Sequence, residues 1–239
     1  MRDALLRALA RPAPDTLAAW EAVRAGTSLA ALPPDAQWLL PLLYARLRAA
    51  GLAEAALAPY ANVYRHNWYK QQVRLRALRP VWEGLQAHGL SPVLMGGAAV
   101  AATGPVRPFT TAVIAAPGLT PAMAEAAERA LTPGTGLQLG WLTDLTVSST
   151  EAVTAAGQEW RVPAPAERLA HALGGVAQAE DASAWLWAAD ALVTAEQLDP
   201  AAWLTVWAHL RAWGRTAVAE ARLADLRAAG VALGQEQPA

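Results

Sequence analysis

Apolar residues recur at helical spacing from Ala4 to Leu90, which predicts that the first third of the chain is helical. Aspartates that follow proline are suitable N-caps, and glycine commonly follows the last helical residue. The helices expected from this pattern span residues 15–25, 35–50 and 55–88. Their expected N-caps and C-terminal glycines are Asp15, Asp35, Gly26, Gly51 and Gly89.

The pattern changes after Ser91, where short apolar and β-branched runs replace the helical spacing. Residues 92–95 predict a strand, and Gly96 and Gly97 predict a tight turn into a short helix of small residues over 98–103. The β-branched run 110–116 predicts a buried strand. The remaining expected elements are a helix over 122–131 with Pro121 at its first position, a strand within 137–147, and a strand at 159–162 pairing beside it.

Helical spacing returns after Pro165 and predicts helices over 166–174, 182–196 and 200–229. Five tryptophans fall in this part of the chain, and we expect them to pack in the core, with a partner-binding surface as the alternative. They are Trp185, Trp187, Trp203, Trp207 and Trp213. The pattern thus predicts an N-terminal helical segment (1–90), an α/β core (91–165), a C-terminal helical segment (166–235) and a frayed tail (236–239).

The amino-acid composition excludes several classes of protein and of functional site. The chain has 239 residues, of which 54% are hydrophobic and 16% charged, so a folded protein is expected rather than a disordered one. A net charge of −1 gives no global attraction for polyanions, and nucleic acid would need a local patch. The absence of cysteine excludes disulfides, thiolate metal sites and a cysteine nucleophile. No signal peptide or membrane span is predicted, and we expect a cytoplasmic protein.

The run from Pro92 to Val100, followed by Arg107-Pro108 and the strand 110–116, resembles the first two motifs of a nucleotidyltransferase family of the polymerase-β-like superfamily. The similarity extends to Leu39-Leu-Pro-Leu-Leu-Tyr44, to the helix before the first strand, to 141–146, to 165–171 and to 185–190. It implies an α+β fold, with a small mixed sheet flanked by the two helical segments. It also implies a nucleotide site at the glycine turn, with magnesium held by acidic side chains.

The chain departs from that family where the chemistry would occur. The resemblance implies Asp-x-Asp on the second strand, and the corresponding residues are Thr111 and Val113. Gly96 and Thr146 replace the family's lysine and histidine, and Asp144 is a vestigial third acid. Because no aspartate or glutamate lies between Glu83 and Glu125, this strand itself lacks the carboxylates that magnesium requires. We therefore expect no metal site and no cofactor. Magnesium is expected only if carboxylates such as Asp181 or Asp190 have replaced the lost ones.

Candidate ligand contacts remain without the metal. Gly96 and Gly97 form either a turn that needs backbone clearance or a retained phosphate cradle. Arg107 is either a phosphate contact or a surface residue, and Thr111 lies on the candidate site strand. Asp144 is either a strand-edge residue or a base. The four histidines show no metal-binding spacing and are interpreted as capping or surface residues; they are His66, His88, His171 and His209.

A basic segment over 65–79 contains five formal cations and no acid. His66, Lys70 and Arg74 are spaced four residues apart on the predicted helix, with Trp68 and Tyr69 interleaved. Cations and aromatic side chains on one helix are typical of nucleic-acid binding, and Arg65, Lys70 and Arg74 are its candidate contacts. The alternative is that these side chains form a solvated helix face that binds no nucleic acid. The near-zero net charge of the chain favours this alternative.

Three functions remain open. The first, which we prefer, is a nucleotidyltransferase-fold pseudoenzyme that binds a nucleotide, or a protein partner at the tryptophan-rich C-terminal helices. The second is an active enzyme with relocated carboxylates. The third is a nucleic-acid-binding module that uses the 65–79 helix.

Overall fold

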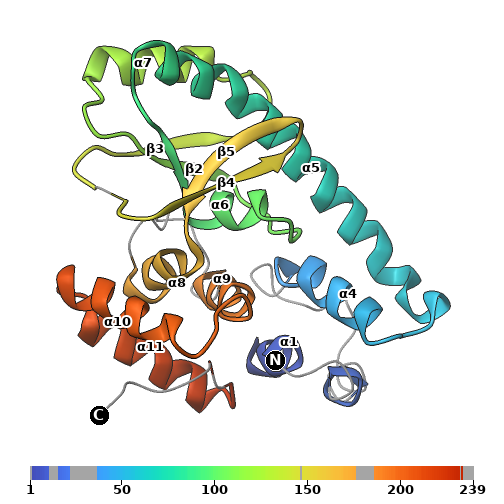
Figure 1. The fold of residues 1–239 in the computed structure, drawn as a ribbon. Coiled ribbons are helices and arrows are strands. Elements are labelled where there is room, and N and C mark those ends of the chain that lie inside the picture. Colours follow the sequence, from blue (N-terminus) through green and yellow to red (C-terminus); the bar gives the residue numbers. More distant parts are fainter. Residues whose placement is uncertain are drawn as a thin grey trace.

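The computed structural model describes residues 2–10, 16–21, 37–145, 147–175, 186–231 and 233. The protein has an α+β fold in which helices from both ends of the chain flank two small sheets (Figure 1). Outside the described residues lie several positions named above, which are Asp15, Gly26, Asp35, Thr146, Asp181, Trp185 and the 236–239 tail.

The helices before the sheets are α1 (Arg2–Ala10), α4 (Leu40–Ala49) and α5 (Glu54–Ala87), and residues 16–21 are also helical. The predicted helix over 55–88 is confirmed by α5. It ends before Gly89, whose φ of +77° is readily adopted by glycine. α4 begins at Leu40 and has proline in its first turn, and the predicted start at Asp35 lies outside the described residues.

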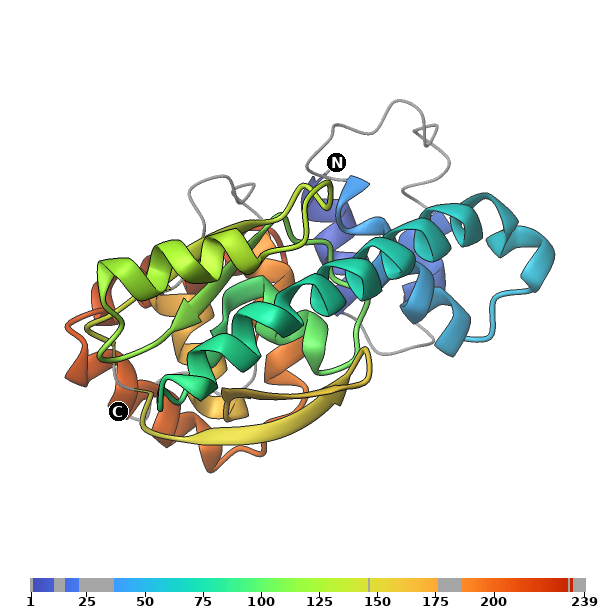
Figure 2. The same cartoon turned by 90° about the horizontal axis from the view of Figure 1, so that it is seen from above.

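The three-stranded sheet is mixed, as expected. β1 (Val93–Met95) runs antiparallel to β2 (Thr111–Ala115), which runs parallel to β3 (Gln138–Leu142). α6 (Gly96–Ala102) follows β1 directly, and α7 (Pro121–Ala130) connects β2 to β3. The Thr120 hydroxyl accepts from the Met123 backbone N–H and caps α7. α5 and α7 lie side by side over one face of the sheet (Figure 2).

The prediction that residues 159–162 pair beside the 137–147 strand was wrong. They lie in β5 (Gln158–Pro163), which forms a separate antiparallel hairpin with β4 (Thr150–Ala155). The turn at Ala156 and Gly157 has positive φ at both residues, as in a tight two-residue hairpin. β5 pairs with β4 because a turn of only two residues joins the two strands and brings them together as a hairpin.

After the hairpin come α8 (Pro165–Gly174), α9 (Leu186–Ala195), α10 (Ala202–Ala212) and α11 (Thr216–Ala228). The predicted helix over 200–229 is therefore two helices, because Gly214 has a φ of +64° and interrupts the helical backbone. Trp187, Trp203 and Trp207 are buried, which confirms core packing for these three tryptophans.

The hydrophobic cores do not follow the order of segments along the chain. One large cluster joins α1, α4 and the start of α5 to the helices α8–α11. A second joins the later half of α5, through Leu78 and Trp82, to α6, α7 and both sheets. α5 thus contributes to both cores, so the N-terminal segment is not packed as an independent unit. The segment boundaries at residues 90 and 165 stay predictions.

Candidate ligand site at the glycine turn

A buried ion pair lies against the Gly96–Gly97 turn. Arg107 and Asp190 are each 5% exposed. The Arg107 Nε donates to Asp190 Oδ1 at 2.7 Å and its Nη2 donates to Asp190 Oδ2 at 2.9 Å, while Nη1 donates to the Pro108 carbonyl. Two parallel bonds of this kind fix the orientation of both groups. The pair joins the segment before β2 to α9, across 83 residues of sequence.

Side chains of α5 position the segment that carries Arg107. Gln71 is buried; its Oε1 accepts from the Arg107 backbone N–H at 2.9 Å, and its Nε2 donates to the carbonyls of Ala101 and Pro105. Arg74 donates to the Phe109 carbonyl, and burial lowers the pKa of its guanidinium. Arg74 therefore stabilises the core and does not belong to an exposed cationic stripe.

Arg107 covers the glycine turn. A Cβ atom added to Gly97 would lie 2.7 Å from the Arg107 guanidinium carbon, and Gly96 has a φ of +57°. The turn therefore requires glycine for backbone clearance, because the Arg107 guanidinium occupies the space that a Cβ atom at position 97 would need. The expectation that Arg107 is a surface residue was wrong. Its phosphate-contact role stays a prediction that would require the buried pair to open.

Gly97→Ala is expected to lower the free energy of unfolding by about 1–2 kcal/mol, because the new methyl group displaces a pinned guanidinium. Gly84→Ala is the matched control. Gly84 lies in α5 with no atom within 4 Å of an added Cβ, so this change is expected to raise stability by about 0.5–1 kcal/mol. Urea denaturation measures both changes. Equal stabilisation by the two alanines would contradict the described packing.

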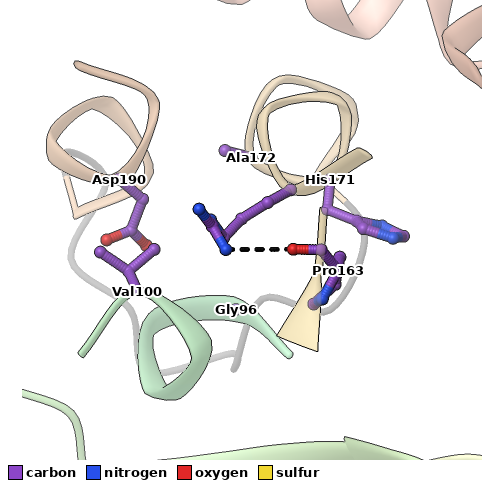
Figure 3. A pocket seen from close by; sticks show the side chains of 7 residues that line it. Gly96, Val100, Pro163, His171, Ala172 and Asp190 are labelled. Atoms are coloured by element: carbon purple, nitrogen blue, oxygen red, sulfur yellow. Dashed lines mark hydrogen bonds between the residues drawn. The ribbon is translucent and has the colours of Figure 1, made fainter. Parts of the chain in front are cut away.

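A small cavity with a mainly apolar lining adjoins the turn. Its volume is about 20 Å³, enough for about one water molecule and far too small for a nucleotide. Asp190 enters from α9 on one side, and His171 extends from α8 on the other (Figure 3). The lining residues are Gly96, Val100, Pro163, Arg168, His171, Ala172 and Asp190.

Arg168 is 3% exposed and connects three elements. Its Nη1 donates to Glu151 Oε1 at 2.9 Å and to the Pro163 carbonyl at 3.0 Å, and its Nη2 donates to Gln197 Oε1 at 2.6 Å. Burial lowers the pKa of this guanidinium, and the ion pair with Glu151 opposes that shift. Arg168 therefore ties α8 to the hairpin and to the end of α9.

His171 is 2% exposed, so its interpretation as a capping or surface histidine was wrong. Its ring stacks on Trp213 at 4.5 Å between centroids, and Trp213 also stacks on His209 at 5.3 Å. Within the described residues neither ring nitrogen of His171 has a hydrogen-bond partner. Burial, assisted by the His209 charge, lowers the pKa of His171 to about 3. The imidazole is therefore neutral at physiological pH.

The sheet face that carries Thr111 and Val113 is apolar. Because alternate residues of a strand share a face, these two side chains point the same way, and both lie beside Gly140 of β3. Val93, Met95, Val113 and Ala115 form a buried cluster on this face, and Leu145 and Val147 pack against it. The face is thus closed by hydrophobic contacts.

Glu167 holds the segment that closes this face. Its buried carboxylate accepts three hydrogen bonds, from the Ser148 backbone N–H at 3.0 Å, the Ser148 hydroxyl at 3.1 Å and the Ser149 backbone N–H at 2.7 Å. Since Ser148 directly follows Val147, these bonds fix Val147 over the sheet.

Asp144 lies apart from the glycine turn. β2 and β3 pair from Thr111↔Gln138 to Ala115↔Leu142, a ladder about 13 Å long, and Asp144 lies beyond its far end. It is exposed and lines an open groove of about 520 Å³. The groove also contains the start of α7 and Trp141. The structure therefore does not bring Asp144 together with Gly96 or Thr111.

Within the part of the chain that the structure describes, no three His, Asp or Glu side chains come together in a group that could hold a metal ion. Arg65 and Lys70, the other candidate contacts, lie exposed on α5. Sequence reasoning did not bring together Arg168, His171 and Asp190, which are buried and line the cavity at the glycine turn. No local pattern marks them, because their partners lie on distant segments.

Comparison with protein-family models, with curated proteins and with solved structures found no match to this chain. None of the described helices is long and apolar enough to cross a membrane.

Proposed function

We propose that this chain is a nucleotidyltransferase-like protein that has lost metal-dependent nucleotidyl transfer and acts by binding. The mixed three-stranded sheet, with a short helix starting at Gly96-Gly97, supports the resemblance in its first two motifs.

The observation that carries the proposal is the closed apolar face of β2. Nucleotidyl transfer requires magnesium to bridge the phosphates and to neutralise charge that develops in the transition state. Here Thr111 and Val113 occupy the positions of the expected acids, and Leu145 and Val147 pack over the same face. A neutral hydroxyl and a valine methyl group do not supply the charge that a hard divalent cation needs.

A nucleotide ligand has more room in the open groove beside Asp144 than at the glycine turn. The groove volume of about 520 Å³ falls in the range of about 300–1,000 Å³ typical of small-molecule sites. It adjoins the carboxyl ends of the parallel strands β2 and β3, where open sheets commonly bind ligands. Trp141 offers an aromatic face for a base.

The test combines nucleotide incorporation with thermal unfolding. With Mg²⁺ or Mn²⁺ and labelled nucleoside triphosphates, we expect no labelled product on protein, small-molecule or RNA acceptors. With the same unlabelled nucleotides, we expect the apparent Tm to rise equally with and without divalent ions, because a ligand that binds the native state stabilises it. Trp141→Ala is expected to abolish the rise, whereas the control Leu204→Ala, which removes an exposed apolar side chain on α10 outside the groove, retains it.

Two results would overturn the proposal. Labelled product that disappears in Asp144→Ala or Asp190→Asn would establish the active enzyme with relocated carboxylates. Thermal shifts that depend on Mg²⁺ would show that the chain still binds a metal–nucleotide complex. A protein partner at the C-terminal helices gains no support from Trp187, Trp203 and Trp207, because all three are buried in the helical core.

A further inference from the structure

α5 presents a long outer face whose side chains the fold does not use. The helix has 34 residues and is about 51 Å long. In its second half Leu75, Leu78 and Trp82 are buried against the sheets. The opposite face carries Arg65, Tyr69, Arg76 and Arg79, which are exposed and spaced by four, seven and three residues. α5 lies at the edge of the molecule, with this stretch unobstructed by other described elements (Figures 1 and 2).

Two neighbouring aromatic side chains on this helix are exposed to solvent. Trp68 is 48% exposed and Tyr69 is 63% exposed, whereas most described tryptophans are buried or half-buried. No stacking partner is recorded for either ring among the described residues. Large exposed aromatic surfaces are unfavourable in water and commonly mark binding sites.

From Arg65 to Arg79 the charges on this face are all positive. Between Ala55 and Trp82 the sequence contains no aspartate or glutamate. Among the described residues Arg76 has no ion pair, and Arg65 donates to the neutral Asn62 amide oxygen at 2.6 Å. Arg79 is the exception, because it pairs with Glu83 at 2.7 Å. The cations therefore favour an anionic partner.

We propose that the outer face of α5 binds single-stranded nucleic acid. Arg65 and Arg76 contact phosphates, and Trp68 and Tyr69 stack on bases. Lys70 lies about 140° around the helix from Arg65 and is not part of this face. The 12 residues from Arg65 to Arg76 span about 16 Å of helix, the length of about five stacked nucleotides. Single strands are favoured over duplexes because unpaired bases expose the ring faces that aromatic side chains stack on. This surface lies outside the groove of the proposed function, so either proposal can fail alone.

Fluorescence anisotropy with a labelled, non-self-complementary 15-nucleotide RNA tests the proposal, with the matching duplex as a second probe. We expect binding to the single strand at 50 mM salt that weakens steeply at 200 mM. Tyr69→Ala is expected to weaken it about tenfold through lost stacking. Arg76→Ala is expected to reduce the slope of log K against log salt by about 0.7, the contribution of one neutralised phosphate.

Arg211→Ala is the matched control, because it removes an exposed cation from α10 and is expected to leave the affinity unchanged. The substituted side chains are exposed, so an unaltered Tm confirms that each variant folds. Three outcomes would overturn the proposal. The first is no binding at 50 mM salt. The second is equal binding of single strand and duplex that Tyr69→Ala does not alter. The third is a dimer in sedimentation that Trp68→Ala dissociates, which would assign the face to a second copy.

Discussion

Asp190→Ala is expected to lower the free energy of unfolding by about 3–5 kcal/mol, because it leaves the Arg107 guanidinium buried without its counter-ion. Arg107 is enclosed by Gly97, Gln71 and Pro108, so water does not readily replace the lost carboxylate. The loss should be accompanied by loosening of the segment before β2, since that segment is joined to α9 by this pair. Chemical denaturation measures the change.

A double variant separates the net contribution of the ion pair to stability from the cost of leaving one buried charge without its partner. Arg107→Met with Asp190→Leu replaces both charges by apolar groups and is expected to recover most of the lost stability. The exposed pair of Arg129 and Glu125 is the control, and Glu125→Ala is expected to cost about 0.5 kcal/mol or less. If Asp190→Ala costs no more than Glu125→Ala, the buried pair is not a stabilising contact.

Protonation of His171 is expected to make the protein less stable in mild acid. The pKa of this imidazole is about 3 in the folded protein, compared with about 6.5 in an unfolded chain. Between these values the unfolded state binds more protons, so stability falls as the pH falls from 6.5 towards 3. The contribution of this single group is about 2 kcal/mol between pH 7 and pH 5.

His171→Phe provides the comparison, because phenylalanine keeps a ring against Trp213 but does not titrate. Its loss of stability between pH 7 and pH 5 should be smaller than that of the wild type by about 2 kcal/mol. Carboxylates common to both proteins cancel in this difference. His66→Gln, which removes an exposed imidazole, is the control and should retain the wild-type difference. Equal pH dependence of wild type and His171→Phe would contradict the burial of the ring.

The buried polar groups connect the closed sheet face to the C-terminal helices. Glu167 fixes the segment that places Val147 over β2, and Arg168, next along α8, holds the hairpin through Glu151. Asp190 on α9 holds Arg107 against the glycine turn. The face that would need to open for catalysis in a nucleotidyltransferase is therefore fixed by α8 and α9, which agrees with the proposed binding role.

Elements with a local signal were predictable. The repeat of apolar residues in α5, the β-branched run of β2 and the Thr120-Pro121 start of α7 each depend on interactions within a few residues. The positive φ of Gly96 was also predictable, since it is a local property, whereas the clearance at Gly97 depends on the Arg107 guanidinium that Asp190 holds in place. The pairing of β5 with β4 was missed because the short, alternating strand β4 was not recognised, although the turn at Gly157 offered a signal.

The sequence by itself determined the helices, the buried strands and the lack of acidic residues around β2, because these are properties of short stretches of chain. Only the tertiary structure decided that Arg107 is buried against Asp190, that Arg74 bonds a core carbonyl while Arg76 faces solvent, and that Asp144 lies at the far end of the ladder. The physical reason is that each of these depends on the burial or strand register created when distant segments pack together. A charged residue gives the same sequence signal whether folding leaves it exposed to water or buries it beside a partner.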